Sequence, residues 1–472
     1  MNMKTFKVTG TLLMLGALMT SSAIHASQLT NAQSYAHTNT LVPAGVTKYH
    51  ASEFPDRVVV VPGENASSTH YVNWRTNAQT KDSVVEITVA QGTPGLHLTA
   101  RSINGSYTVL ETENGLAHHH NAVLSDLEPD TLYAYRVKGD NTWSEWFQFR
   151  TPASMFEPYS AVYFGDAQNA VKAYFSRTVR EAVMTAPRAR LMIHAGDLVN
   201  SRDGIHDDEW GEWFDAMSWS GASVSQLPVP GNHEFIEDEN EYRHLVEHWE
   251  AQFKVAGNGP EGLERTVYYT DFQGVRYISL DSMEALQNEE NAKQQAAWLR
   301  NVLADNPNHW TVVVHHHPMF SVSLGRDNPL LRKHWLPIYE EFGVDLVLQG
   351  HDHTYGRGHN MSGTDAGPVY IVSVAGPKMY LVSEQAEARM QRNAEDVQLF
   401  QTLDFSHERL QYKSFTVTGE LYDAFDIVRT ESGATRIEDN TPERAEQRCA
   451  NPAPLRETRC WNGTELIYAP TK

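Results

Sequence analysis

Strand-like runs of apolar and aromatic residues, separated by turns, dominate the chain from residue 45 to 152. The runs are short and closely spaced: RVVVVP, HYVNWRT, SVVEITVA, SYTVLET, HNAVLSDL, LYAYRVKG and EWFQFRT. The turns between them carry Gly, Pro and Asn, which favour reversals of the chain. Short strands at this spacing are typical of two packed antiparallel sheets, so we predict an all-β sandwich over 45–152.

From residue 153 to 435 the pattern changes, because apolar runs alternate with amphipathic stretches. SAVYF is followed by a helical pattern over 170–184, and RLMIHA by DDEWGEWFDAM. NEENAKQQAAWLRNVLAD predicts a helix before WTVVV, and LRKHWLPIYEEF precedes VDLVL. This alternation predicts an α/β domain (α+β layered). LQYKSFTVTGELYDAFDIVR then predicts a closing hairpin.

The chain begins with a segment that is typical of export. Lys4 and Lys7 precede the apolar run VTGTLLMLGALM and the small residues SSAIHAS. The apolar run is too short for a membrane span, so residues 1–26 are predicted to be a secretory signal peptide. We expect cleavage after Ala26 or after Ala23. No other stretch approaches a transmembrane length, so a periplasmic or secreted protein without a membrane span is expected.

Two irregular segments flank the predicted domains. Residues 27–44 are polar and patternless and are predicted to be a linker, and 436–472 form a charged tail. The tail holds the only two cysteines, Cys449 and Cys460. In an oxidising compartment these are expected to form a disulfide.

Composition limits the class of function. The 472 residues are 41% hydrophobic and 21% charged, as in ordinary globular proteins, and the formal net charge is −21. This acidity argues against a nucleic-acid-binding surface, which would need a basic patch. It would also repel anionic substrates, so a site for an anion must carry local positive charge, which metal ions could supply. The sequence does not indicate an oligomeric state.

Five short blocks carry the candidate chemistry: GDAQ, GDLVN, GNHE, HHHP and GHDH. They follow the apolar runs, and an α/β fold gathers its site at strand ends. Carboxylate, amide and imidazole side chains are ligands of first-row metals. The set is sufficient for two metal ions that share a bridging ligand, an arrangement that can activate the attacking and leaving oxygens of a displacement. The candidate ligands are Asp166, Asp197, Asn232, His316, His351 and His353.

The order GD, GDxx, GNH, HxP, GHxH resembles the calcineurin-like metallophosphoesterases. The upstream domain resembles fibronectin type III domains, in which Tyr133 of LEPDTLYAYRV would be the corner tyrosine and Trp74 a core residue. Together the two domains look most like the purple acid phosphatase branch. The resemblance covers roughly residues 45–435. It implies that the second domain is a metallophosphoesterase β-sandwich flanked by helices, and that the protein is a binuclear metal-dependent hydrolase of phosphate esters.

The resemblance also implies a role for each block. Asp166 and His353 would bind the first metal and Asp197 would bridge both. The second site would be completed by Asn232, His316 and His351, with His316 taken from the HHH run because it lies two residues before Pro318. His233 would face the phosphate as general acid or charge stabiliser, a task that suits imidazole near neutral pH. The metal pair would come from Fe, Zn or Mn.

Four positions depart from the family or extend its site. Asn200 stands where the purple enzymes carry the tyrosine of GDxxY, so we expect an enzyme that is not purple. Gln168 stands where other members carry histidine, and could ligate, hydrogen-bond a ligand or line the loop. Arg326 is the best available cation to bind a phosphate oxygen, because guanidinium matches phosphate geometry. Asn169 is a further candidate for substrate contact.

The predicted activity is that of a phosphomonoesterase, similar to an acid phosphatase, acting on a small phosphate ester through a metal-bridging hydroxide. A phosphodiesterase or nucleotidase on the same site is the main alternative, because loops choose between these substrates. A non-catalytic, metal-stabilised surface-binding module is an alternative of another class. Metal content and a substrate panel distinguish the three.

Overall fold

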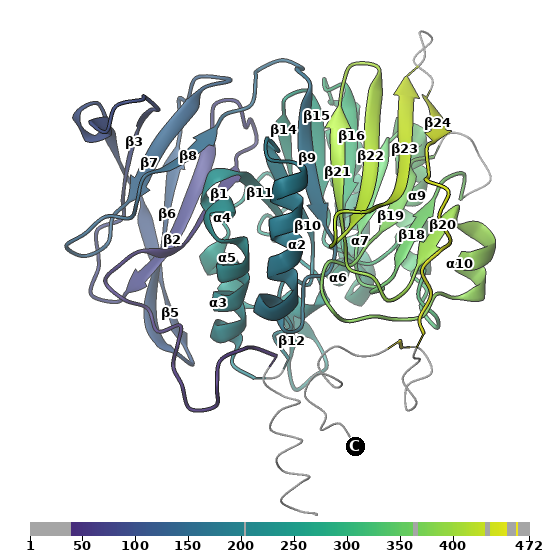
Figure 1. Ribbon diagram of the computed structural model, residues 1–472, viewed down its shortest axis with the longest axis horizontal. Coiled ribbons are helices and arrows are strands. Elements are labelled where there is room, and N and C mark those ends of the chain that lie inside the picture. The colour runs from purple at the N-terminus through teal and green to yellow at the C-terminus, as the bar shows by residue number, and fades with distance from the viewer. Residues whose placement is uncertain (1–38, 203, 362–366, 430–434, 451–458, 461–472) are drawn as a thin grey trace, which may run out of the picture.

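The computed structural model describes residues 39–202, 204–361, 367–429, 435–450 and 459–460. The predicted signal peptide, most of the predicted linker and part of the tail lie outside the described residues. Among those described, no helix is long and apolar enough to cross a membrane. Figure 1 shows two joined bodies, a β-sandwich at one end and a larger layered domain.

Two four-stranded sheets form the first domain, as the strand spacing predicts. One has the order β1-β2-β6-β5 and the other β4-β3-β7-β8, with every pairing antiparallel. The strands are β1 Asp56–Pro62, β2 His70–Asn77, β3 Val84–Val89, β4 Arg101–Asn104, β5 Ser106–Thr112, β6 Gly115–Leu124, β7 Leu132–Val137 and β8 Phe147–Arg150, with the 3-10 helix η1 at Leu96–Leu98. Their inward residues form a separate core around the buried Trp74.

The two aromatic residues singled out in the sequence, Tyr133 and Trp74, both have hydrogen-bond partners. The backbone N–H of Glu128 donates to the Tyr133 hydroxyl at 2.8 Å, which fixes the turn before β7. Trp74 donates from its indole nitrogen to the Lys138 carbonyl at 3.1 Å. Buried indole and phenol groups therefore have their polar atoms paired, and the role of both aromatic residues here is packing.

Two seven-stranded sheets form the second domain. The first has the order β11-β10-β9-β21-β22-β23-β24 and the second β14-β15-β16-β17-β19-β18-β20. The strands are β9 Tyr159–Phe164, β10 Leu191–Ala195, β11 Ser225–Val229, β14 Tyr268–Phe272, β15 Val275–Ser279, β16 Trp310–Val314, β17 Leu346–Gln349, β18 Tyr355–Gly358, β19 Val369–Val372, β20 Arg392–Ala394, β21 Leu399–Phe405, β22 Arg409–Thr416, β23 Leu421–Arg429 and β24 Thr435–Asp439. A small hairpin pairs β12 Phe235–Glu237 with β13 Arg243–Leu245. The predicted closing hairpin is β22–β23.

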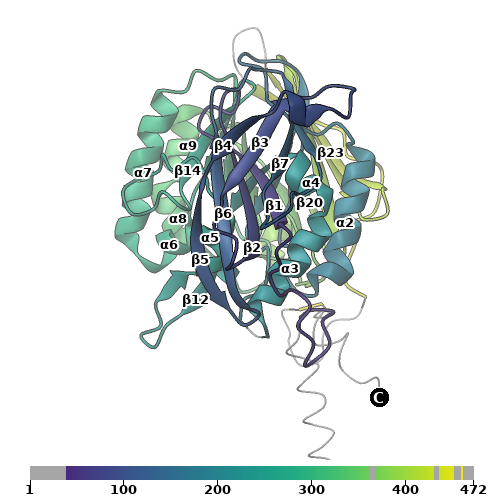
Figure 2. The same cartoon turned by 90° about the vertical axis from the view of Figure 1, so that its left-hand side faces the viewer.

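Helices cover both outer faces of the paired sheets, with α2 on one side and α7, α8 and α9 on the other (Figure 2). The helices are α2 Val171–Thr185, α3 His206–Met217, α4 Trp219–Ser223, α5 Glu247–Gln252, α6 Ser282–Gln287, α7 Glu289–Ala304, α8 Pro329–His334, α9 Leu336–Phe342 and α10 Glu384–Arg389. The Asn288 side chain caps α7 by accepting from the backbone N–H of Glu290, and acidic residues fill its first turn. LRKHWLPIYEEF contributes to two helices instead of one, because Pro337 has no N–H to continue the helix across Trp335.

A buried carboxylate joins the two domains. Asp207 of α3 lies 2.7 Å from the Arg57 guanidinium and 3.1 Å from that of Arg75, both on strands of the first domain. Asn114 also donates to it at 3.0 Å. Burial alone would raise the pKa of Asp207, but the two arginines hold it below its usual range. The domains are therefore held in a fixed relation by charges that have no access to water.

We predict that Asp207→Asn destabilises the protein by about 3–5 kcal/mol, because the substitution removes the counter-charge of the buried Arg57 and one of the two carboxylates that pair with the buried Arg75. Chemical denaturation followed by tryptophan fluorescence measures the change. Asp82→Asn is the control, since Asp82 pairs with Lys138 at an exposed position. Equal denaturation midpoints for the two variants would contradict the assignment.

Candidate metal centre

The five polar blocks meet at one edge of the layered domain. β9, β10 and β11 are parallel neighbours in the first sheet, and β16 and β17 are parallel neighbours in the second. Parallel strands end at the same edge, so the loops that follow them converge. The first sheet brings Asp166, Asp197 and Asn232, and the second brings His316, His351 and His353.

Ligand atoms from both sheets lie within metal-binding distance of one another. Asp197, His316 and His351 have one potential ligand atom each within 4.8 Å of the others, and so do Asp166, Asp197 and His353. His316 Nε2 lies 3.1 Å from Asp197 Oδ2 and 3.2 Å from Asn232 Oδ1. Asp197 belongs to both groups, so its carboxylate has the position of a bridge.

Glycines in the blocks create the space for this approach. A Cβ on Gly231 would lie 2.3 Å from Asp197 Oδ1, and one on Gly350 would lie 2.7 Å from Asp166 Oδ2. Real Cβ atoms essentially never come so close. Gly231 and Gly350 are therefore required at these positions, because a carboxylate oxygen lies where the Cβ of any other residue would be.

The candidate ligands also share an uncommon backbone conformation. Asp197, His351 and His353 have φ values of 52°, 71° and 50°, in the left-handed region that non-glycine residues seldom adopt. Such conformations persist only where the surrounding structure imposes them, and they concentrate at functional sites. Here they turn three side chains back toward the sheet edge.

Hydrogen bonds at the far side of each ring orient the imidazoles. His316 Nδ1 lies 2.8 Å from the Ala195 carbonyl, which accepts its proton and leaves Nε2 for the site. His233 Nδ1 is paired in the same way with the Asn200 carbonyl, and its Nε2 lies 4.0 Å from Asp197 Oδ2. Both rings therefore present Nε2 to the same carboxylate.

The electrostatics of the site fit a cation. Burial raises the pKa of Asp166 against the opposing charge of His316. Burial would lower the pKa of His316, but the charges of Asp197 and Asp166 raise it. Both carboxylates thus favour a positive charge beside them, which a metal ion supplies when its binding displaces the proton of His316. Asp166 Oδ2 has no hydrogen-bond partner among the described residues, which leaves a buried acceptor for an ion. The residues present thus fit a metal pair.

Glu234 is a structural element of the site that the sequence analysis missed. Its buried carboxylate accepts from the backbone N–H of Asp197 at 2.9 Å, Leu198 at 2.8 Å and Gly231 at 2.7 Å. These bonds join the loop after β10 to the loop after β11. The only sequence signal was its place directly after GNH, and a glutamate there is as easily read as a surface residue.

Two of the departures from the family lie beside Asp197. Gln168 donates from Nε2 to Asp197 Oδ2 at 2.8 Å and has Nε2 3.0 Å from His353 Nε2. If the Gln168 amide is turned by about 180°, its oxygen, a possible ligand atom, faces the site in place of Nε2. Asn200 is buried, and its backbone positions His233.

The two candidate substrate contacts have partners of their own. Asn169 donates to the Asn39 side chain at 2.9 Å. Arg326 lies 3.2 Å from Asp352 Oδ1 and also donates to the His351 carbonyl, so it is held against the loop that carries two candidate ligands. Lys378 follows β19, which runs parallel to β17 and ends at the same sheet edge. The sequence analysis did not single out Lys378, although the apolar run before it predicted a strand that ends nearby.

Comparison with known proteins identifies both domains. Residues 55–151 match the purple acid phosphatase N-terminal domain, and residues 160–355 match the calcineurin-like phosphoesterase domain. Two uncharacterised proteins of Mycobacterium tuberculosis are 28% identical over 344 residues, which is 64% of this chain. The match spans 61% of the length of each of these two relatives.

Further relatives have named activities. Acid phosphatase type 7 of Danio rerio is 26% identical over 76% of this chain and 85% of its own length. Fe(3+)-Zn(2+) purple acid phosphatase 12 of Arabidopsis thaliana is 22% identical over 77% and 79%. The solved structure of PhoD covers 84% of this chain and 94% of its own with a TM-score of 0.59 at 12% identity, a likeness in fold.

We predict that Glu234→Gln lowers stability by about 1–3 kcal/mol, because the amide cannot accept all the backbone N–H groups that the carboxylate serves. Thermal unfolding measures the loss. Glu237→Gln is the matched control, since Glu237 is exposed on the nearby β12. If Glu234→Gln unfolds at the same temperature as this control, the carboxylate does not join the two loops.

Proposed function

We propose that this protein is a binuclear metal-dependent hydrolase that acts on small phosphate esters. The chain joins a purple acid phosphatase N-terminal domain to a calcineurin-like phosphoesterase domain. The observation that carries the proposal is the position of Asp197 in two separate groups of ligand atoms. A carboxylate shared in this way is what a two-metal site needs. Small phosphomonoesters are the proposed substrates, in the periplasm or outside the cell, and the Cys449–Cys460 disulfide supports such an oxidising location.

The proposed ligand sets follow the two groups. Asp166 and His353 would hold the first ion, Asn232, His316 and His351 would hold the second, and Asp197 would contribute to both. When bound, the metal pair supplies Lewis acidity and makes water a nucleophile near neutral pH. The pair is drawn from Fe, Zn and Mn. Asn200 cannot supply a phenolate ligand. We therefore propose that the first site accepts metals other than ferric iron.

His233 is the proposed acid of the reaction. Its Nδ1 holds a proton on the Asn200 carbonyl, which fixes the ring with Nε2 toward Asp197. In its protonated form, Nε2 carries a second proton that can stabilise a phosphoryl oxygen and pass to the leaving alkoxide. Positioned proton transfer of this kind accelerates a reaction by about 10²–10⁴-fold.

Our first prediction for this site concerns metal content. Asp197→Asn should lose both ions, because both depend on the bridge, whereas Asp166→Asn should retain the second. Elemental analysis of protein reconstituted with Fe, Zn or Mn measures the stoichiometry. Asp140→Asn, an exposed substitution in the first domain, should bind as the unaltered protein does. A full complement of metal in Asp197→Asn would contradict the shared ligand.

A second prediction separates proton transfer from binding. His233→Asn should lower kcat for an alkyl phosphate such as glycerol phosphate by about 10²–10⁴-fold, with metal content retained. The loss should be smaller with p-nitrophenyl phosphate, because p-nitrophenolate leaves without a proton. His244→Gln on exposed β13 is the control. Equal losses for both leaving groups would contradict the acid role, and faster turnover of bis-p-nitrophenyl phosphate than of the monoester would favour a phosphodiesterase.

A further inference from the structure

Three cations surround one buried tyrosine beside the metal centre. Arg326 lies over the Tyr380 ring with its guanidinium carbon 4.8 Å from the ring centroid, and Arg459 lies at 5.0 Å. Lys378 Nζ lies 5.7 Å from the same centroid. We call Arg326, Lys378 and Arg459 the cation cluster. These three residues are more than 50 positions apart in the sequence, so only the tertiary structure brings them together.

The cation cluster adjoins the candidate ligands directly. The Tyr380 and His353 ring centroids are 4.9 Å apart, and the Tyr380 backbone N–H donates to the His353 carbonyl at 3.0 Å. Arg326 donates to the carbonyl of His351. The cluster and the candidate ligands are therefore neighbours, joined by Tyr380 and by the loop that carries His351 and His353.

The described residues supply one carboxylate within ion-pair distance of the cluster. Arg326 pairs with Asp352 at 3.2 Å. For Lys378 and Arg459, no carboxylate of the described residues lies within ion-pair distance. Neighbouring cations repel, and that repulsion is relieved when an anion binds between them. The chain as a whole carries a net charge of −21, so three cations this close together are a local exception that suits an anionic ligand.

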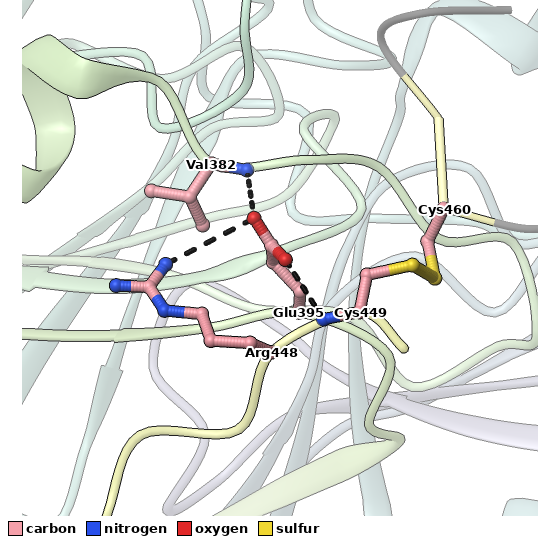
Figure 3. The surroundings of a disulfide bond; sticks show 5 residues. All are labelled: Val382, Glu395, Arg448, Cys449 and Cys460. Atoms are coloured by element: carbon pink, nitrogen blue, oxygen red, sulfur yellow. Dashed lines mark hydrogen bonds and ion pairs between the residues drawn. A yellow bond between two sulfur atoms is a disulfide. The ribbon is translucent and has the colours of Figure 1, made fainter. Parts of the chain in front are cut away.

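A disulfide holds Arg459 in the cluster. Cys460 is bonded to Cys449, and its backbone N–H donates to the Met379 carbonyl at 3.2 Å, while Arg459 pairs with Tyr380 in a short β-bridge. At the other side, the Cys449 backbone N–H donates to Glu395 Oε2 at 2.9 Å (Figure 3). The same Glu395 carboxylate accepts from the Val382 backbone N–H, two residues beyond Tyr380.

We propose that Arg326, Lys378 and Arg459 form a subsite for a second phosphate group of the substrate, and that the Cys449–Cys460 disulfide holds Arg459 in that subsite. This inference rests on the proposed function and names its substrate class: small molecules that carry two phosphate groups.

Charge decides between a second phosphate and the reacting one. The reacting phosphate would already face two metal ions and His233, which offset its charge and that of the attacking nucleophile. Three further cations can serve a second phosphate group. Each charge-assisted contact to a phosphate oxygen contributes enough to change affinity by about tenfold. A substrate with a second phosphate uses these cations, whereas a simple monoester does not.

The test compares fructose 1,6-bisphosphate with fructose 6-phosphate, which differ by one phosphate group. The unaltered, metal-loaded protein should bind the bisphosphate about tenfold more tightly by calorimetry and show the same preference in KM. Arg459→Gln and Lys378→Gln should each remove most of that preference. The double variant Cys449→Ser, Cys460→Ser should behave like Arg459→Gln, because Arg459 is no longer held. Arg436→Gln, an exposed cation on β24, is the matched control and should retain the preference.

Each result decides the proposal. Equal affinity of the unaltered protein for the two sugars overturns it, and so does a preference that survives in both cation variants. Equal loss of affinity for both sugars in Arg459→Gln places the cluster on the reacting phosphate and also overturns it. If the protein hydrolyses no phosphate ester, the proposed function fails, but the calorimetric comparison still tests the subsite. A cysteine variant that keeps the preference refutes the role of the disulfide alone.

Discussion

A buried carboxylate needs compensating charge, and at Asp197 this requirement organises the centre of the molecule. Its oxygens face His316 and His233 and receive hydrogen bonds from Gln168 and from the backbone N–H of His233. Burying an anion without partners would cost several kcal/mol, so every loop around it supplies a donor or a cation. The missing side chain at Gly231 and the positive φ of Asp197 both follow from the need to admit those partners.

The same rule operates away from the centre. Asp207 is buried between the domains and compensated by Arg57 and Arg75, so the sandwich cannot tilt without exposing three charges. This connection reaches the metal centre through α3, where Glu209 accepts from the backbone N–H of Asn200 at 2.6 Å. Asn200 in turn positions His233. The first domain is thus connected through one helix to the position of His233.

The sequence predicts what depends on local pattern. Strand spacing was sufficient for the first domain, and apolar runs followed by GD, GNH and GHxH located the loops that converge, because parallel strands end at one edge. The break between α8 and α9 at Trp335 depended on one proline within a continuous amphipathic pattern. Glu234 and Arg459 could not be assigned roles, since their partners are set by tertiary contacts. Charge alone does not reveal which acid accepts backbone bonds or which arginine reaches a site.

The disulfide implies that the cation cluster is completed in two steps. Arg326 and Lys378 reach their positions when the sheets pack, as any core residue does. Arg459 depends in addition on a covalent bond that needs an oxidant, which a reducing cytoplasm does not provide. Maturation of the complete cluster is therefore separated from folding of the catalytic domain.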